Sequence, residues 1–101
     1  MTTKIQDNGY AAAGIQKMIA IFNKATEKLF PNCEVEHFYY GDTLSMSTVR
    51  LAPGHYGHFN IGENRVALTG YTCSWDELDL FKSMTYRDEC FKGQLLQLAE
   101  N

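Results

Sequence analysis

Apolar residues recur at alternating steps of four and three between Tyr10 and Phe30, and charged residues fall between them. This spacing places the apolar side chains on one face of a helix. They are Ala11, Ile15, Met18, Phe22, Ala25 and Leu29. At about 1.5 Å per residue, such a helix is roughly 30 Å long, about the width of a small domain. The pattern therefore predicts one long amphipathic helix that organises the fold, with Asp7 or Asn8 as its cap and Pro31 at its end.

The middle third of the chain loses this helical period. β-branched and aromatic residues occur there in four runs, near residues 33–40, 44–51, 55–61 and 65–71. Glycine-containing turns at Gly41, Gly54 and Gly62 separate the runs. Because turns this short join antiparallel neighbours, the pattern predicts a four-stranded antiparallel meander.

Alternation along these runs divides the predicted sheet into two faces. The side chains expected to face the long helix are Val35, Leu44, Met46, Phe59, Ile61, Val66 and Leu68. The opposite face is expected to carry Glu34, Glu36, Phe38, Tyr40, Tyr56, His58, Thr69 and Tyr71. This second face is more aromatic than a solvated face usually is. Two explanations remain open: the face binds a partner, or the C-terminal part of the chain covers it.

The C-terminal third returns to a helical pattern. Ser74 and Glu77 form a capping box, which predicts that a helix begins there. Thr85 and Asp88 repeat the pattern and predict a final helix from Tyr86 to about Ala99. The chain as a whole is predicted to be a single compact α+β domain over residues 1–101. In it, a long N-terminal helix packs on the four-stranded antiparallel meander, and one or two C-terminal helices follow.

Composition narrows the class of protein. The chain has 101 residues, of which 45% are hydrophobic, and a net charge of −3, with six acids against three bases after residue 73. The absence of a Lys/Arg cluster argues against direct binding of nucleic acid. No run approaches the roughly 18 apolar residues of a membrane span, so no membrane partner is expected. Three widely spaced cysteines indicate reduced thiols and a cytoplasmic protein.

Residues that could carry chemistry are few. His55 and His58 are three apart, so on a strand they point to opposite faces, and neither a metal nor another cofactor is predicted. Glu34 and Glu36 share a face about 7 Å apart. They fit the protection of a sheet edge better than a glycosidase pair. Cys73 lies just before a helix N-terminus, where a thiol can become reactive. This leaves one alternative, a small enzyme or ligand-binding domain that uses Cys73 and His58.

Protein recognition is the function that the sequence favours over catalysis. Aromatic side chains on a sheet face and an acidic helix start provide contact area at low entropic cost. The expected partner-binding residues are Phe38, Tyr40, Tyr56, His58, Tyr71, Trp75, Asp76, Glu77 and Asp79. The sequence thus predicts a small acidic non-enzymatic module that binds another protein, such as an inhibitor or adaptor. Phage and mobile-element accessory proteins that act on host complexes share this character. The coiled-coil spacing of the first helix also leaves a homodimer open.

Overall fold

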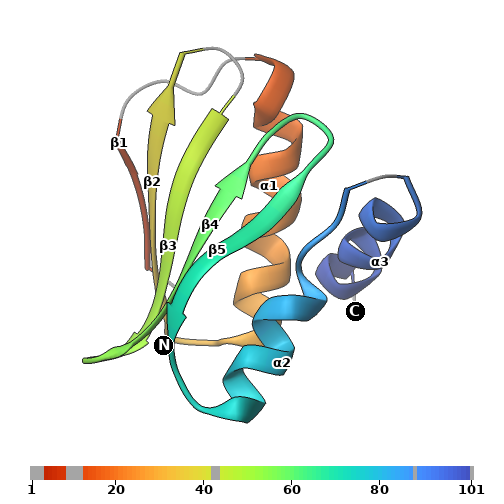
Figure 1. The fold of residues 1–101 in the computed structure, drawn as a ribbon. Coiled ribbons are helices and arrows are strands. Elements are labelled where there is room, and N and C mark those ends of the chain that lie inside the picture. Colours follow the sequence, from red (N-terminus) through yellow and green to blue (C-terminus); the bar gives the residue numbers. More distant parts are fainter. Residues whose placement is uncertain (1–3, 9–12, 42–43, 88, 101) are drawn as a thin grey trace.

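The structure of the protein, a computed structural model, describes residues 4–8, 13–41, 44–87 and 89–100 (Figure 1). Within these residues the chain forms five strands and three helices. The strands are β1 (Lys4–Asn8), β2 (Glu34–Tyr40), β3 (Leu44–Ala52), β4 (His55–Ile61) and β5 (Val66–Thr72). The helices are α1 (Ala13–Leu29), α2 (Trp75–Ser83) and α3 (Glu89–Glu100).

The strands form one sheet in the order β1-β2-β3-β4-β5. Strands β2 to β5 are antiparallel neighbours, as predicted, but β1 adds to β2 in parallel, so the sheet is mixed. The prediction of four strands and of a helix as the first element was therefore wrong. A parallel pair requires a long crossover connection, and α1 provides it between β1 and β2. The α+β class is confirmed.

The strand β1 also changes the predicted start of the helix. Asp7 and Asn8 were expected to cap α1, but both belong to β1, where they pair with His37 and Phe38. The first described residue of α1 is Ala13, and the predicted start at Tyr10 lies outside the described residues. This strand was missed because its five residues contain a single apolar side chain, Ile5, so no alternation is visible.

All three described helices lie on one face of the sheet (Figure 1). The ring of Phe59, on the inner face of β4, packs edge-on against Phe22 of α1 and against Phe81 of α2, with centroids 5.1 and 5.6 Å apart. The helix α3 packs on α1. Within the residues that the structure describes, no helix covers the opposite face of the sheet, the open face, so the alternative that the C-terminal helices cover it was wrong.

The predicted faces of the sheet need two corrections. In β3, Ser45, Ser47 and Val49 are buried under the helices, whereas Met46 is exposed and Leu44 is half-buried on the open face. The predicted two-residue alternation of β3 was correct, but the residues assigned to the helix side lie on the open face. The strand holds two apolar sets of opposite phase, and the set formed by Val49 and Leu51 faces the helices.

Tyr71 is the second correction. The pairing of β4 with β5 shifts register between His58 and Phe59, so one extra residue of β5 is inserted as a β-bulge. Beyond the bulge the side chains change face. Tyr71 consequently lies on the helix side of β5, together with Leu68, and not beside Phe38.

The predicted C-terminal elements are largely confirmed. Ser74 caps α2 and Glu77 completes the capping box. The described part of the last helix begins at Glu89, while Tyr86, predicted to be its first residue, instead forms an isolated antiparallel bridge with Val66. Asp88, which was predicted to form the capping pattern of this helix together with Thr85, lies outside the described residues.

Candidate functional site

The open face of the sheet carries four of the predicted binding residues, Phe38, Tyr40, Tyr56 and His58. Cross-strand pairing arranges its outward side chains in rows. A charged row holds Lys4, Glu34 and Arg50 and ends at Tyr56; a polar row holds Gln6, Glu36, Thr48 and His58; and a third row holds the apolar Phe38 and Met46 and ends at the polar Asn60. The chemical character of the face therefore changes steadily from charged at one end to apolar at the other.

The apolar patch, which consists of Phe38, Tyr40, Leu44 and Met46, occupies one end of this face. Phe38 lies directly opposite Met46 and Tyr40 opposite Leu44, so the four side chains adjoin. Phe38, Tyr40 and Met46 are 41%, 56% and 46% exposed. A shallow hollow of about 370 Å³ lies beside them. Its lining includes Phe38, Tyr40, Met46, Thr48, His58, Asn60 and Thr69.

Hydrogen-bonding side chains border the apolar patch. The Nδ1 atom of His58 lies 2.9 Å from Oγ1 of Thr48 on the neighbouring strand, and the His58 ring lies 4.8 Å from that of Tyr56. Thr69 donates to the backbone oxygen of His58. These contacts hold the imidazole at the border between the polar row and the apolar patch. The open face thus combines the apolar patch at one end with hydrogen-bonding side chains beside it.

A buried polar network lies under the other face, between the sheet and α1. His37 is fully buried; its Nδ1 lies 2.5 Å from Oγ of Ser47 and its Nε2 2.7 Å from Oδ1 of Asn23. Ser45 extends the network from Ser47 at 3.0 Å. Burial lowers the pKa of His37 to about 4, although the charge of Asp7 acts in the opposite direction. The imidazole is therefore neutral at pH 7.

Tyr39 connects this network to the edge of the sheet. Its ring stacks on that of His37, with centroids 6.0 Å apart, and its hydroxyl donates to Oδ1 of Asp7 at 2.6 Å. Burial, together with this hydrogen bond, raises the pKa of Tyr39 well above its usual value. This side-chain hydrogen bond links β2 to β1 in addition to their backbone pairing. It therefore stabilises the pairing of a strand that has little apolar surface.

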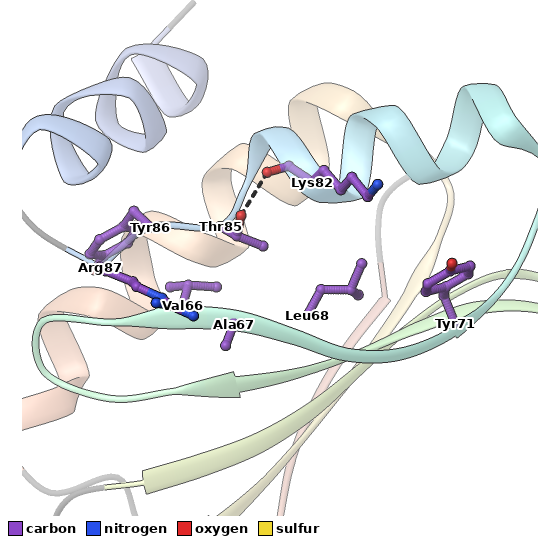
Figure 2. Close-up of a pocket in the computed structure, with 8 residues that line it drawn as sticks. All are labelled: Val66, Ala67, Leu68, Tyr71, Lys82, Thr85, Tyr86 and Arg87. Atoms are coloured by element: carbon purple, nitrogen blue, oxygen red, sulfur yellow. Dashed lines mark hydrogen bonds between the residues drawn. The ribbon is translucent and has the colours of Figure 1, made fainter.

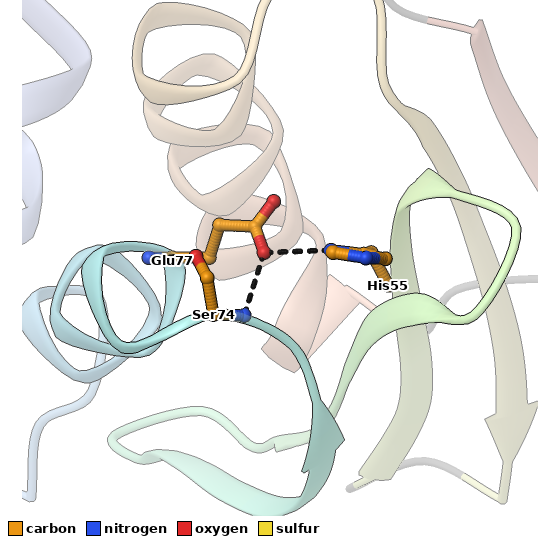
Figure 3. A network of polar contacts seen from close by, with 3 residues as sticks. All are labelled: His55, Ser74 and Glu77. Atoms are coloured by element: carbon orange, nitrogen blue, oxygen red, sulfur yellow. Dashed lines mark hydrogen bonds and ion pairs between the residues drawn. The ribbon is translucent and has the colours of Figure 1, made fainter.

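The start of α2 is held by a second polar cluster (Figure 3). The Oε1 atom of Glu77 accepts from the backbone N–H of Ser74 and from Nδ1 of His55, both at 2.8 Å. The Ser74 hydroxyl accepts from the N–H of Glu77 in return. The backbone bond from Ser74 is the main reason that the pKa of Glu77 is lowered, and the His55 bond adds to it. Glu77 therefore joins α2 to the start of β4.

Trp75, the next residue after this cap, is 80% exposed. Asp76 and Asp79 are exposed on the same helix, so α2 presents a tryptophan and two carboxylates to solvent. These residues are carried by α2 and not by the open face of the sheet.

Cys73 and His58, which formed the alternative enzymatic pair, have different environments. Burial raises the pKa of the Cys73 thiol, and the charge of Glu77 raises it further. The thiolate that a nucleophile requires is therefore disfavoured at neutral pH. Cys73 also does not line the hollow of the open face that His58 lines. Among the described residues, no three His, Cys, Asp or Glu side chains are grouped so that they could hold a metal ion.

The structure thus divides the predicted binding residues into separate groups. Phe38, Tyr40, Tyr56 and His58 share the open face; Tyr71 lies on the helix side of β5; and Trp75, Asp76, Glu77 and Asp79 lie on α2. Leu44 and Met46, which complete the apolar patch, were not among the predicted binding residues. The sequence held one signal for their position. His37 has the same alternation phase as Val35, and a buried imidazole needs polar partners such as Ser45 and Ser47 on the facing strand. If these serines are buried, the intervening residues of the strand point to the open face.

No family model matches the chain, and no curated protein or solved structure matches it significantly. In the described part of the chain, none of the helices combines the length and apolarity that crossing a membrane demands.

Proposed function

We propose that this chain is a small protein-binding module, acting as an inhibitor or adaptor, and that it contacts its partner through the apolar patch. The observation that supports this proposal is the exposure of three large apolar side chains, Phe38, Tyr40 and Met46, next to one another on an open sheet face. Contiguous apolar surface of this kind is costly in water and is typical of binding sites.

The surroundings of the apolar patch favour a protein over other partners. A protein interface typically has an aromatic and aliphatic centre with a polar rim, and Thr48, His58 and Asn60 supply such a rim. The cations of the same face, Lys4 and Arg50, lie at the far end of the sheet and alternate with Glu34 in the charged row. A nucleic acid would instead require a continuous basic surface.

The proposal is tested by comparing capture of proteins from the native host by three forms of the chain. The patch variant combines Phe38→Ser and Met46→Ser, and the control variant is Leu80→Ser, which removes an exposed apolar residue of α2. We expect one or more proteins to be retained by the wild type and by the control but lost by the patch variant. Direct binding of each such protein is then measured with purified components.

Two further arms separate other outcomes. If Trp75→Ser abolishes capture while the patch variant does not, the binding surface is α2 and the proposal is wrong. If the wild type sediments as a dimer that the patch variant converts to a monomer, the patch binds a second copy of the chain. Identical capture by all forms would overturn the proposal, provided that circular dichroism shows each variant to be folded.

A further inference from the structure

The strand β5 is the edge of the sheet on the side of α2 (Figure 1). Edge strands expose backbone N–H and C=O groups, and proteins usually protect them with charged side chains. The opposite edge follows this rule, since β1 carries Lys4 and Asp7. The seven residues of β5, Val66–Thr72, include none that is charged. The β5 edge therefore lacks the charged side chains that protect the β1 edge from pairing with another strand.

The segment that follows α2 pairs with the outer side of β5 and then leaves it. Val66 and Tyr86 exchange two backbone hydrogen bonds of 2.9 Å in an antiparallel bridge. Within the described part of the chain, Tyr86 is the one residue that pairs with this side of β5. Backbone groups two residues apart on a strand point to the same side. The N–H and C=O of Leu68 therefore point away from β4, as those of Val66 do.

A cavity of about 420 Å³ lies next to this edge, between β5 and the end of α2 (Figure 2). Its apolar lining includes Leu68, Tyr71 and Tyr86, with Val66 and Ala67 beside them. The Lys82 side chain extends along it toward Tyr71, and Arg87 lies beside Val66. Of the described side chains that line the cavity, none is acidic, although the whole chain has a net charge of −3. The cavity is therefore a cationic site on an acidic protein.

We propose that β5 accepts an extended acidic segment of a partner protein as an additional strand, beside Leu68 and in line with Tyr86. The backbone of that segment pairs with Leu68, and its side chains alternate between the two sides of the sheet. The side chains on the helix side enter the cavity, where a carboxylate is attracted to Lys82 and Arg87. This site is separate from the apolar patch and does not depend on it.

The test uses capped seven-residue peptides with a fluorescent label, in which glutamate alternates with valine. Two control peptides replace glutamate by lysine, or carry N-methyl groups on alternate backbone nitrogens so that a strand cannot form. Binding is measured by anisotropy at low ionic strength, where charge attraction is largest. We expect the glutamate peptide to bind at least tenfold more tightly than either control, and amide hydrogen exchange of Leu68 to slow at saturation.

Matched variants decide whether the site is the one proposed. Lys82→Glu combined with Arg87→Glu changes two exposed side chains and should reverse the preference, so that the lysine peptide binds more tightly. The patch variant with Phe38→Ser and Met46→Ser should bind the glutamate peptide as the wild type does. The proposal is overturned if the glutamate and lysine peptides bind equally, if N-methylation has no effect, or if Leu68 exchanges at an unchanged rate.

Discussion

The Nδ1 atom of His37 lies 2.5 Å from the hydroxyl oxygen of Ser47, directly across the β2–β3 pair and under α1. The other ring nitrogen, Nε2, lies 2.7 Å from the carbonyl oxygen of the Asn23 side chain. A neutral imidazole has one donor and one acceptor nitrogen. Because the Asn23 oxygen can only accept, Nε2 carries the proton and Nδ1 accepts from Ser47. The network thus joins two strands to α1 while its imidazole remains uncharged.

This arrangement makes stability sensitive to acid. The pKa of His37 is lowered to about 4 from 6.5, so the unfolded chain binds a proton between these values and the folded chain does not. Stability contributed by the neutral imidazole is fully present above pH 6.5 and is lost as the pH falls toward 4. Linkage predicts a loss of about 2 to 3 kcal/mol between pH 7.5 and pH 4.5.

Urea unfolding at several pH values measures this loss. A His37→Gln variant is expected to be less stable at pH 7.5 and to lack most of the pH dependence between 6.5 and 4.5. The matched control is His58→Gln, which replaces an imidazole on the open face, outside the buried network. An unchanged profile in His37→Gln would show that other groups cause the dependence.

Phe22 is the centre of the contact between α1 and the sheet. Its side chain is fully buried and its ring packs edge-on against Phe59. Replacing it by alanine removes this contact and leaves a cavity, so Phe22→Ala should cost about 3 to 5 kcal/mol of unfolding free energy. Chemical denaturation measures the cost. Met46→Ala, on the exposed face, is the control and should cost far less; similar losses in both variants would contradict the packing described.

Gly57, on the inner face of β4, lies against Phe81 of α2. A Cβ atom at this position would lie 3.0 to 3.2 Å from three ring carbons of the fully buried Phe81. Gly57→Ala should therefore destabilise the fold by about 1 to 3 kcal/mol through overpacking. Gly93→Ala is the matched control, since no described neighbour lies within 4 Å of its Cβ position in α3. It should stabilise the protein by about 0.5 to 1 kcal/mol. A lower melting temperature for Gly57→Ala and a higher one for Gly93→Ala would support the surroundings described for both glycines.

The cap of α2 should respond to single substitutions. Ser74→Ala removes the acceptor for the Glu77 backbone N–H and should cost about 1 kcal/mol of stability. Ser74→Asp retains an acceptor at the same position and should restore most of that loss. If both variants lose the same amount, the hydroxyl does not act as a cap.

A substitution at Tyr40 tests binding to the partner separately from the stability of the fold. Its side chain belongs to the apolar patch and is 56% exposed. Tyr40→Ala should weaken binding to the partner identified by capture by about 1 to 2 kcal/mol, as truncated interface aromatics commonly do. The melting temperature should stay close to that of the wild type. A large drop in melting temperature with unchanged affinity would show that the ring serves packing.

The errors of prediction have distinct physical causes. β1 was missed because its pairing depends on the backbone and on a bond between Tyr39 and Asp7, residues far apart in the chain. Leu44 and Met46 were assigned to the wrong face because apolar character alone cannot distinguish two phases within β3. Tyr71 was misplaced because a β-bulge arises from pairing with β4 and has no local signature.

Local patterns were sufficient for α1, for the four antiparallel strands and for the capped start of α2. Helical periodicity, strand alternation, short turns and a capping box each act through neighbours within a few residues, so sequence alone determined these elements. Which face of the sheet is covered, which aromatic side chains remain exposed and where the β5 edge opens depend on contacts between distant segments. Only the tertiary structure decides them, because burial belongs to the packed chain as a whole.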